Sequence, residues 1–262
     1  ISSRALKLIL LSQILMCISA NRLHFQLINV LSQIAFTYFL SFLIMQLRFR
    51  WQAVAAAFLL VFHWGLFVIF PGPEGPFSQM GNVGQMFDYA VLGYNYPGKY
   101  VTINFLSSTV TTLFGVWTGL LLKSDRTRAQ KLKILAGSMV ACFASGLALS
   151  PVIPLVKRIW TPSFTLYSTG WVLFMMLVFF WLIEVRGYRK FAFPLVVVGM
   201  NSVFIYSVGI LFGGGIRRAV GVFTGNFTWV GALAPVVLHA CSLLFMWYVC
   251  YWLYKRKIFF KL

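Results

Sequence analysis

Acidic side chains are scarce in this chain. Its 262 residues include four Asp and Glu against 22 Lys and Arg, and charged residues make up only 10% of the total. A soluble domain carries roughly 25% charged residues. The 60% hydrophobic share therefore excludes an ordinary soluble fold and indicates an integral membrane protein.

Cysteines are also few, and none has a spacing that suggests chemistry. All four fall inside apolar runs, without a CxxC pair or a Cys/His metal-binding pattern: Cys17, Cys142, Cys241 and Cys250. Free cysteines in such surroundings behave as small hydrophobic residues. The sequence thus predicts no disulfide, no zinc site and no other metal.

Long apolar runs dominate what is present. Eight are near the ~20 residues that a membrane-spanning helix needs. They are 5–20, 25–47, 51–70, 105–122, 132–150, 164–185, 191–212 and 228–254. We predict an all-α, polytopic transmembrane bundle that forms one membrane domain over residues 1–262. Because the chain starts at Ile1 with no signal-peptide pattern, we expect it to be the C-terminal part of a longer bundle.

The basic residues alternate between the two sides of this eight-span arrangement. Sixteen fall on one side: Arg4, Lys7, Arg48, Arg50, Lys123, Arg126, Arg128, Lys131, Lys133, Arg186, Arg189, Lys190, Lys255, Arg256, Lys257 and Lys261. Six fall on the other: Arg22, Lys99, Lys157, Arg158, Arg217 and Arg218. The positive-inside rule then predicts that both ends are cytoplasmic. The charge of +18 is a topology signal, which favours anionic membrane lipid over nucleic acid as a partner.

Only the connection from Pro71 to Asn104 is long. It holds four of the nine prolines, six glycines and two of the four acids, Glu74 and Asp88. Such a segment cannot span lipid, because its backbone polar groups would lack partners. Aromatic residues recur through it and argue against disorder: Phe77, Phe87, Tyr89, Tyr94, Tyr96 and Tyr100. We predict an ordered cap over the outer mouth of the bundle.

No Asp, Glu, Lys or Arg falls in the middle of a predicted span. Ion-coupled transporters and pumps usually keep such residues within the bilayer, so their absence disfavours that class. The candidate polar residues inside spans are Gln33, His63, Asn201 and Ser202, with Thr109, Thr111 and Thr112 in the fourth span and His239 in the last. The Asn, Gln, Ser and Thr residues can hydrogen-bond one helix to another or line a polar cavity, whereas His63 and His239 are each either a core residue with one hydrogen bond or a catalytic residue.

The segment Lys157–Ser163, KRIWTPS, is a second feature of the outer side. Trp160 suits the membrane interface, and Thr161 followed by Pro162 predicts a helix N-cap and first turn. Interfacial anchoring does not account for two cations on the side where cations are disfavoured. Lys157 and Arg158 are therefore candidates to bind an anionic group, or to hold Asp88 or Glu74.

Several of these segments, in this order, resemble the bacterial branch of the heparan-alpha-glucosaminide N-acetyltransferase family. The matching pieces are NVLSQIAFTY at 29–38, GPF…GN…FD…LG at 75–93, TTLFGVWTGLLL at 111–122, KRIWTPSFTLYSTG at 157–170, GMNS at 199–202 and YKRKIFFKL at 254–262. The spacing agrees over essentially the whole chain. One departure is Thr102-Ile103-Asn104, where the lysosomal branch carries Pro-Glu-Gly.

The resemblance implies a polytopic helical bundle in the bacterial inner membrane. It also implies transfer of acetyl from cytoplasmic acetyl-CoA to an amino sugar or glycan on the far side. The family's catalytic His would precede Ile1, and none of the His residues here matches it. The residues expected to surround the acceptor are Asp88, Asn104, Lys157, Trp160, Thr161, Ser163, Asn201 and Ser202, supported by Gln33 and His63.

The basic segment Lys123–Lys133 offers a landing site for the phosphates of CoA, although a solvated topology signal is the simpler explanation. A transporter or flippase for a glycan or a lipid-linked sugar would use the same cap and polar span residues. A non-catalytic membrane scaffold is a third alternative. The sequence leaves the oligomeric state open, a homodimer included.

Overall fold

The computed structural model of this protein describes residues 2–94 and 100–260, and Tyr96, Lys99 and Lys261 lie outside these ranges. The described residues form helices and no strand, which confirms the all-helical fold class. The α-helices are α1 Ser2–Ala20, α2 Val30–Met45, α3 Phe49–Ile69, α4 Val83–Leu92, α5 Phe105–Lys123, α6 Arg128–Leu149, α7 Pro162–Phe180, α8 Arg189–Gly199, α9 Ser202–Thr224 and α10 Ala234–Lys255. Short 3-10 segments cover Thr102–Asn104 and Gly225–Leu233, and a π-helical turn at Trp181–Val185 extends α7.

Most of the predicted spans are helices long and apolar enough to cross a membrane. They are α1, α3, α5 with its preceding 3-10 turn, α6, α7 with its π-turn, and the α9–α10 stretch. Large apolar side chains on these helices point outward, with Phe58 and Val61 each 62% exposed. An outward-facing apolar surface of this kind suits surrounding lipid rather than water.

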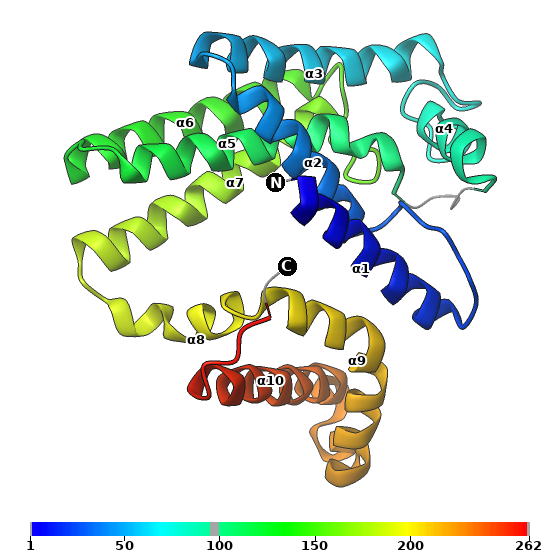
Figure 1. The fold of residues 1–262 in the computed structure, drawn as a ribbon, viewed down its shortest axis with the longest axis vertical. Coiled ribbons are helices and arrows are strands. Elements are labelled where there is room, and N and C mark those ends of the chain that lie inside the picture. The colour runs from blue at the N-terminus through cyan, green and yellow to red at the C-terminus, as the bar shows by residue number, and fades with distance from the viewer. Residues whose placement is uncertain (1, 95–99, 261–262) are drawn as a thin grey trace. The chain divides into compact units, whose positions relative to one another are not determined.

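The chain divides into two compact units. The first contains residues 1–13 and 25–187, and the second contains residues 14–24 and 188–262. In the first unit, α5, α6 and α7 lie side by side, as Figure 1 shows in green and yellow-green. Gly146 of α6 permits this close approach, because a Cβ there would lie 2.7 Å from the backbone nitrogen of Tyr167 in α7.

Local sequence signals set several helix ends in this unit. The Thr127 hydroxyl accepts the Gln130 amide, and the Gln130 side chain accepts the Thr127 amide, so a capping box starts α6. Pro162 occupies the first turn of α7 as predicted. The predicted second span begins later than expected, because the Asn29 side chain accepts the Ser32 amide and caps α2 at Val30.

The cap contains one α-helix, α4, bounded by polar residues. The Asn82 side chain accepts the Gln85 amide at its start, and Gly93 ends it in the left-handed conformation. Below α4, a small hydrophobic core joins Phe67 of α3, Val101 and Ile103 of the cap, and Ile159 before α7. The described part of the cap is therefore ordered and packed on the first unit.

Two predictions about the second unit are wrong. The predicted span 191–212 is two helices, because Asn201 leaves helical geometry (φ −128°, ψ 34°) between α8 and α9. The predicted end of that span at residue 212 is also wrong, since α9 continues through Gly213-Gly214-Gly215 to Thr224 and ends at Gly225 (φ +60°). Arg217 and Arg218 consequently lie inside an apolar helix rather than in an outer loop.

Candidate functional site

A group of buried polar residues lies where the cap meets the starts of α5 and α7. Asp88 of α4 is fully buried, and the Thr102 amide donates to both of its carboxylate oxygens at 3.2 Å. Burial raises the pKa of Asp88 to about 6, although the hydrogen bonds from Thr102 act in the opposite direction. Asp88 therefore titrates close to neutral pH.

The next residues of this group are Asn104 and Trp160. The Asn104 side-chain amide donates to the Arg158 carbonyl at 2.9 Å, and the Ser107 hydroxyl donates to the Trp160 carbonyl at 2.7 Å. These two bonds fasten the loop before α7 to the start of α5. Trp160 adopts a left-handed backbone conformation (φ +53°), which is uncommon for a bulky residue and often marks a functional segment.

Three buried polar atoms in this group have no partner among the described residues. They are the Oδ1 acceptor of Asn104, which is fully buried, the indole Nε1 donor of Trp160 and the hydroxyl of Thr102. A buried unpaired polar atom is destabilising by about 1–3 kcal/mol, so such atoms commonly bind water or a ligand group. The group thus offers an acceptor at Asn104, a donor at Trp160 and a hydroxyl at Thr102, which can do either, to an incoming polar molecule. We call Asp88, Thr102, Asn104, Ser107 and Trp160 the cap cluster.

Thr161 and Ser163 form hydrogen bonds within the loop that precedes α7. The Thr161 hydroxyl donates to the Pro154 carbonyl at 2.8 Å and accepts the Val156 amide at 3.1 Å. The Ser163 hydroxyl donates to the same carbonyl at 3.0 Å. Thr161 holds the N-cap position as predicted, but its side chain makes no capping bond to α7.

The predicted outer cations are solvent-exposed. Lys157 and Arg158 are both exposed, and in the described residues Asp88 pairs with Thr102 rather than with either of them. Glu74 is exposed as well. Lys157 is therefore an exposed cation three residues before Trp160 of the cap cluster.

The two supporting residues have different environments. Gln33 of α2 donates from its side-chain amide to the Ser108 hydroxyl of α5 at 2.9 Å. That hydrogen bond joins α2 to α5 one helical turn after Asn104. His63 of α3 is 1% exposed, its ring packs 4.9 Å from the Phe67 ring, and neither ring nitrogen has a partner among the described residues.

Asn201 and Ser202 belong to the second unit. The Asn201 side chain donates to the Ile258 carbonyl at 3.2 Å and accepts the Phe260 amide at 3.0 Å, so it holds the C-terminal segment. Ser202 is exposed. These contacts give Asn201 a structural role within its own unit.

Arg217 and His239 form a polar pair between α9 and α10 that the sequence did not reveal. The His239 Nδ1 lies 2.6 Å from the Pro235 carbonyl, and Nε2 lies 3.1 Å from Arg217 Nη1. A carbonyl only accepts and a guanidinium only donates, so these two contacts fit the tautomer that carries its proton on Nδ1. His239 is thereby a hydrogen-bonded helix residue.

Hydroxyl and glycine residues form a stripe along α5 below the cap cluster. At helical spacing it comprises Asn104, Ser107, Thr111, Gly115 and Thr118. The Thr111 hydroxyl lies 3.0 Å from that of Thr169 in α7. This spacing was readable from the sequence, but without the position of α7 it did not indicate which face was buried.

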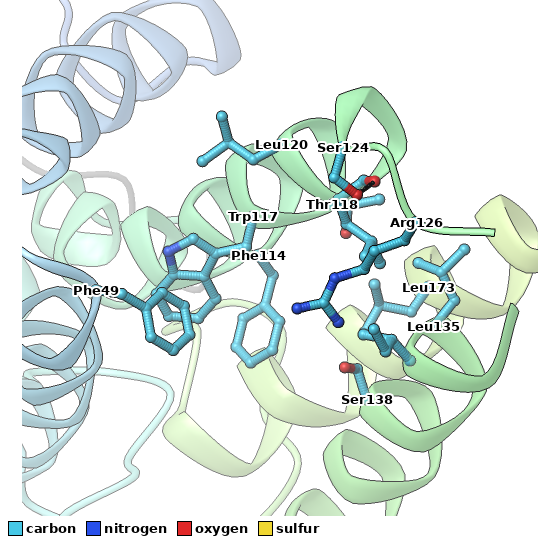
Figure 2. A pocket seen from close by; sticks show the side chains of 12 residues that line it. Phe49, Phe114, Trp117, Thr118, Leu120, Ser124, Arg126, Leu135, Ser138 and Leu173 are labelled. Atoms are coloured by element: carbon cyan, nitrogen blue, oxygen red, sulfur yellow. Dashed lines mark hydrogen bonds between the residues drawn. The ribbon is translucent and has the colours of Figure 1, made fainter. Parts of the chain in front are cut away.

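Two cavities adjoin this stripe. One of about 100 Å³ lies between α5 and α7 and is lined by Thr111, Gly115, Thr118 and Thr169, among others. The other, of about 370 Å³, lies at the C-terminal end of α5 and shares Phe114, Thr118 and Leu173 with the first. Figure 2 shows the Arg126 guanidinium turned into this second cavity. We call it the Arg126 pocket.

The described residues hold no group of three His, Cys, Asp or Glu side chains arranged for a metal ion. A comparison with protein-family models finds no match for this chain. A comparison with curated proteins finds no match either.

Proposed function

We propose that this chain is part of a membrane acetyltransferase that moves acetyl from acetyl-CoA on one side to an amino sugar or glycan on the other. One observation carries the proposal. Along one face of α5, hydroxyl side chains that are buried at Ser107 and Thr118 and half-buried at Thr111 lie between the cavities near the basic segment 123–133 and the cap cluster, which has an unpaired donor and acceptor. Acetyl transfer across a membrane needs such a connection between a donor side and an acceptor side.

The proposed reaction needs a base for the amine proton and residues that bind the acceptor. The acceptor amine attacks the thioester carbonyl carbon, the C–S bond breaks, and CoA leaves as the thiol after taking a proton. The amine proton passes to a base, which the family resemblance assigns to a His preceding Ile1. The residues of this chain would then bind the acceptor and orient its amine.

Each cluster residue has a matching task in that scheme. The Asn104 Oδ1 accepts a hydrogen bond from an acceptor N–H or O–H, and the Trp160 Nε1 donates to an oxygen. The Trp160 ring and the neighbouring Tyr100 ring, 6.4 Å apart, supply apolar surface. Asp88 orients the Thr102 backbone, and Lys157 is an exposed cation for an anionic glycan.

Substitution of Trp160 tests this assignment. Trp160→Phe keeps an aromatic ring and removes the N–H donor. We expect the rate of acetyl transfer to glucosamine to fall about tenfold or more. The rate is measured as the release of free CoA by protein in nanodiscs. Trp171→Phe is the matched control, because Trp171 is exposed on α7. Equal activity of both variants and the wild type would remove Trp160 from the acceptor site.

Passage of a glycan or lipid-linked sugar is the second candidate, and the same hydroxyl stripe favours it. A transporter or flippase would move its solute unchanged and without acetyl-CoA. Uptake of a labelled sugar by vesicles that contain the protein but no acetyl-CoA, with recovery of unmodified sugar, would favour this alternative.

A further inference from the structure

The Arg126 pocket combines an unpaired cation with mostly apolar walls. Arg126 precedes α6, and in the described residues its guanidinium forms no hydrogen bond or ion pair. Figure 2 shows this group directed between Phe114 on one side and Leu135 and Ser138 on the other. Arg126 is exposed, and an exposed guanidinium beside apolar groups can form charge-assisted hydrogen bonds with an anionic partner.

The pocket also holds hydroxyl donors for that partner. The Thr118 and Ser138 side chains line it, and neither hydroxyl bonds to another described residue. The only acid near the pocket in sequence is Asp125, which is exposed and forms no ion pair among the described residues. An anion with several oxygens, such as a phosphate, suits one guanidinium and two hydroxyls.

The aromatic wall of the pocket is held in place. The Trp117 indole nitrogen donates to the Gln52 side-chain oxygen at 2.7 Å. The Phe49 and Phe114 rings pack edge-to-face against it at 5.4 and 5.0 Å. A wall fixed in this way presents a preformed apolar surface beside the cation.

The mouth of the pocket suits a ligand that arrives from the bilayer. Phe49 and Leu120 line it and are 66% and 54% exposed, like other apolar side chains on these helices. The pocket also lies at the C-terminal end of α5, where an apolar span is followed by a basic loop. Such a boundary is expected at the depth of the lipid headgroups. A soluble anion would need none of this apolar surface.

We propose that the Arg126 pocket binds an anionic phospholipid. Its phosphate pairs with Arg126, Thr118 and Ser138, and one acyl chain lies along the wall of Phe49, Phe114 and Trp117. This pocket is also the larger of the two cavities at the donor end of the α5 stripe, so a bound lipid would occupy it in place of CoA, but lipid binding itself involves no acetyl transfer.

Binding by delipidated protein in mild detergent tests the proposal, measured by native mass spectrometry and thermal melting. Phosphatidylglycerol should bind the wild type and raise its melting temperature, whereas phosphatidylcholine and inorganic phosphate should not. Arg126→Gln should weaken phosphatidylglycerol binding about tenfold, the loss expected for a charged hydrogen-bonded pair. Arg128→Gln should leave binding within about twofold, because that neighbouring cation lies outside the pocket lining.

Several results would overturn it. Equal binding of phosphatidylcholine would mean that the pocket does not recognise the negative charge of the lipid. Equal stabilisation by inorganic phosphate would make the ligand a soluble anion. Equal losses in Arg126→Gln and Arg128→Gln would reduce the effect to diffuse attraction by the basic loop. None of these measurements uses acetyl-CoA or an acceptor, so they leave the test of acetyl transfer separate.

Discussion

Replacing Asp88 with asparagine should remove a pH dependence from the stability of this protein. The Asp88 carboxyl lies outside the spans, in α4, and burial raises its pKa from 3.8 to about 6. The folded state therefore binds its proton more tightly than the unfolded state. Stability linked to this group is fully present below the unfolded pKa of 3.8 and is lost as pH rises through about 6.

The size of the effect follows from that shift. The rise of the Asp88 pKa from 3.8 to about 6 corresponds to roughly 3 kcal/mol at most. The amide introduced by Asp88→Asn carries no charge at any pH, and its oxygen can still accept the Thr102 amide. The variant should therefore be more stable than the wild type above pH 6 and should lose that advantage near pH 4.

Melting temperatures in detergent between pH 4 and pH 8 measure this difference. Glu74→Gln is the matched control, because Glu74 is an exposed acid in the same cap. The control should follow the wild-type curve throughout. A constant offset between Asp88→Asn and the wild type across the pH range would refute the reasoning, since it would show that Asp88 does not titrate there in the folded protein.

Two further substitutions test the packing. Gly146→Ala should lower stability by about 1–3 kcal/mol, since its Cβ would meet the Tyr167 backbone, whereas Gly137→Ala in the same helix has open space and should be neutral or slightly stabilising. Urea or thermal unfolding of both variants measures this, and equal effects would mean that α6 and α7 do not pack closely at Gly146. Asn201→Ala should free the C-terminal segment that its side chain holds, whereas exposed Ser202→Ala should not. Limited proteolysis measures this, and equal cleavage of both variants would argue against the Asn201 contacts.

The sequence predicted much of the first unit because its signals are local. Apolar runs indicated the helices, and Pro162 and the Pro/Gly composition of the cap marked ends and connections. The buried contacts of Asp88 were not readable. They depend on Thr102, which is distant along the chain and is brought near by the packing of the cap.

The wrong predictions concern long apolar segments, in which the hydrophobicity of the whole run did not show where each helix ends or breaks. Gly213-Gly214-Gly215 is a poor helix former in water, yet α9 continues through it, and glycine is common in membrane helices. The run 191–212 is continuously apolar, so its hydropathy concealed the break at Asn201. The sequence assigned Arg126 only to a basic segment that could be a topology signal or a landing site for CoA phosphates. Its pocket could not be predicted, because the lining residues come from several helices.

Acetyl transfer across a sealed membrane is the most direct test of the central proposal. The full-length protein is reconstituted into vesicles with glucosamine inside, and acetyl-labelled acetyl-CoA is added outside. The account predicts N-acetylglucosamine inside and free CoA outside in equal amounts, in the vesicle population that exposes the basic 123–133 segment. Release of unmodified glucosamine without acetylation, or no product in either orientation, would contradict it.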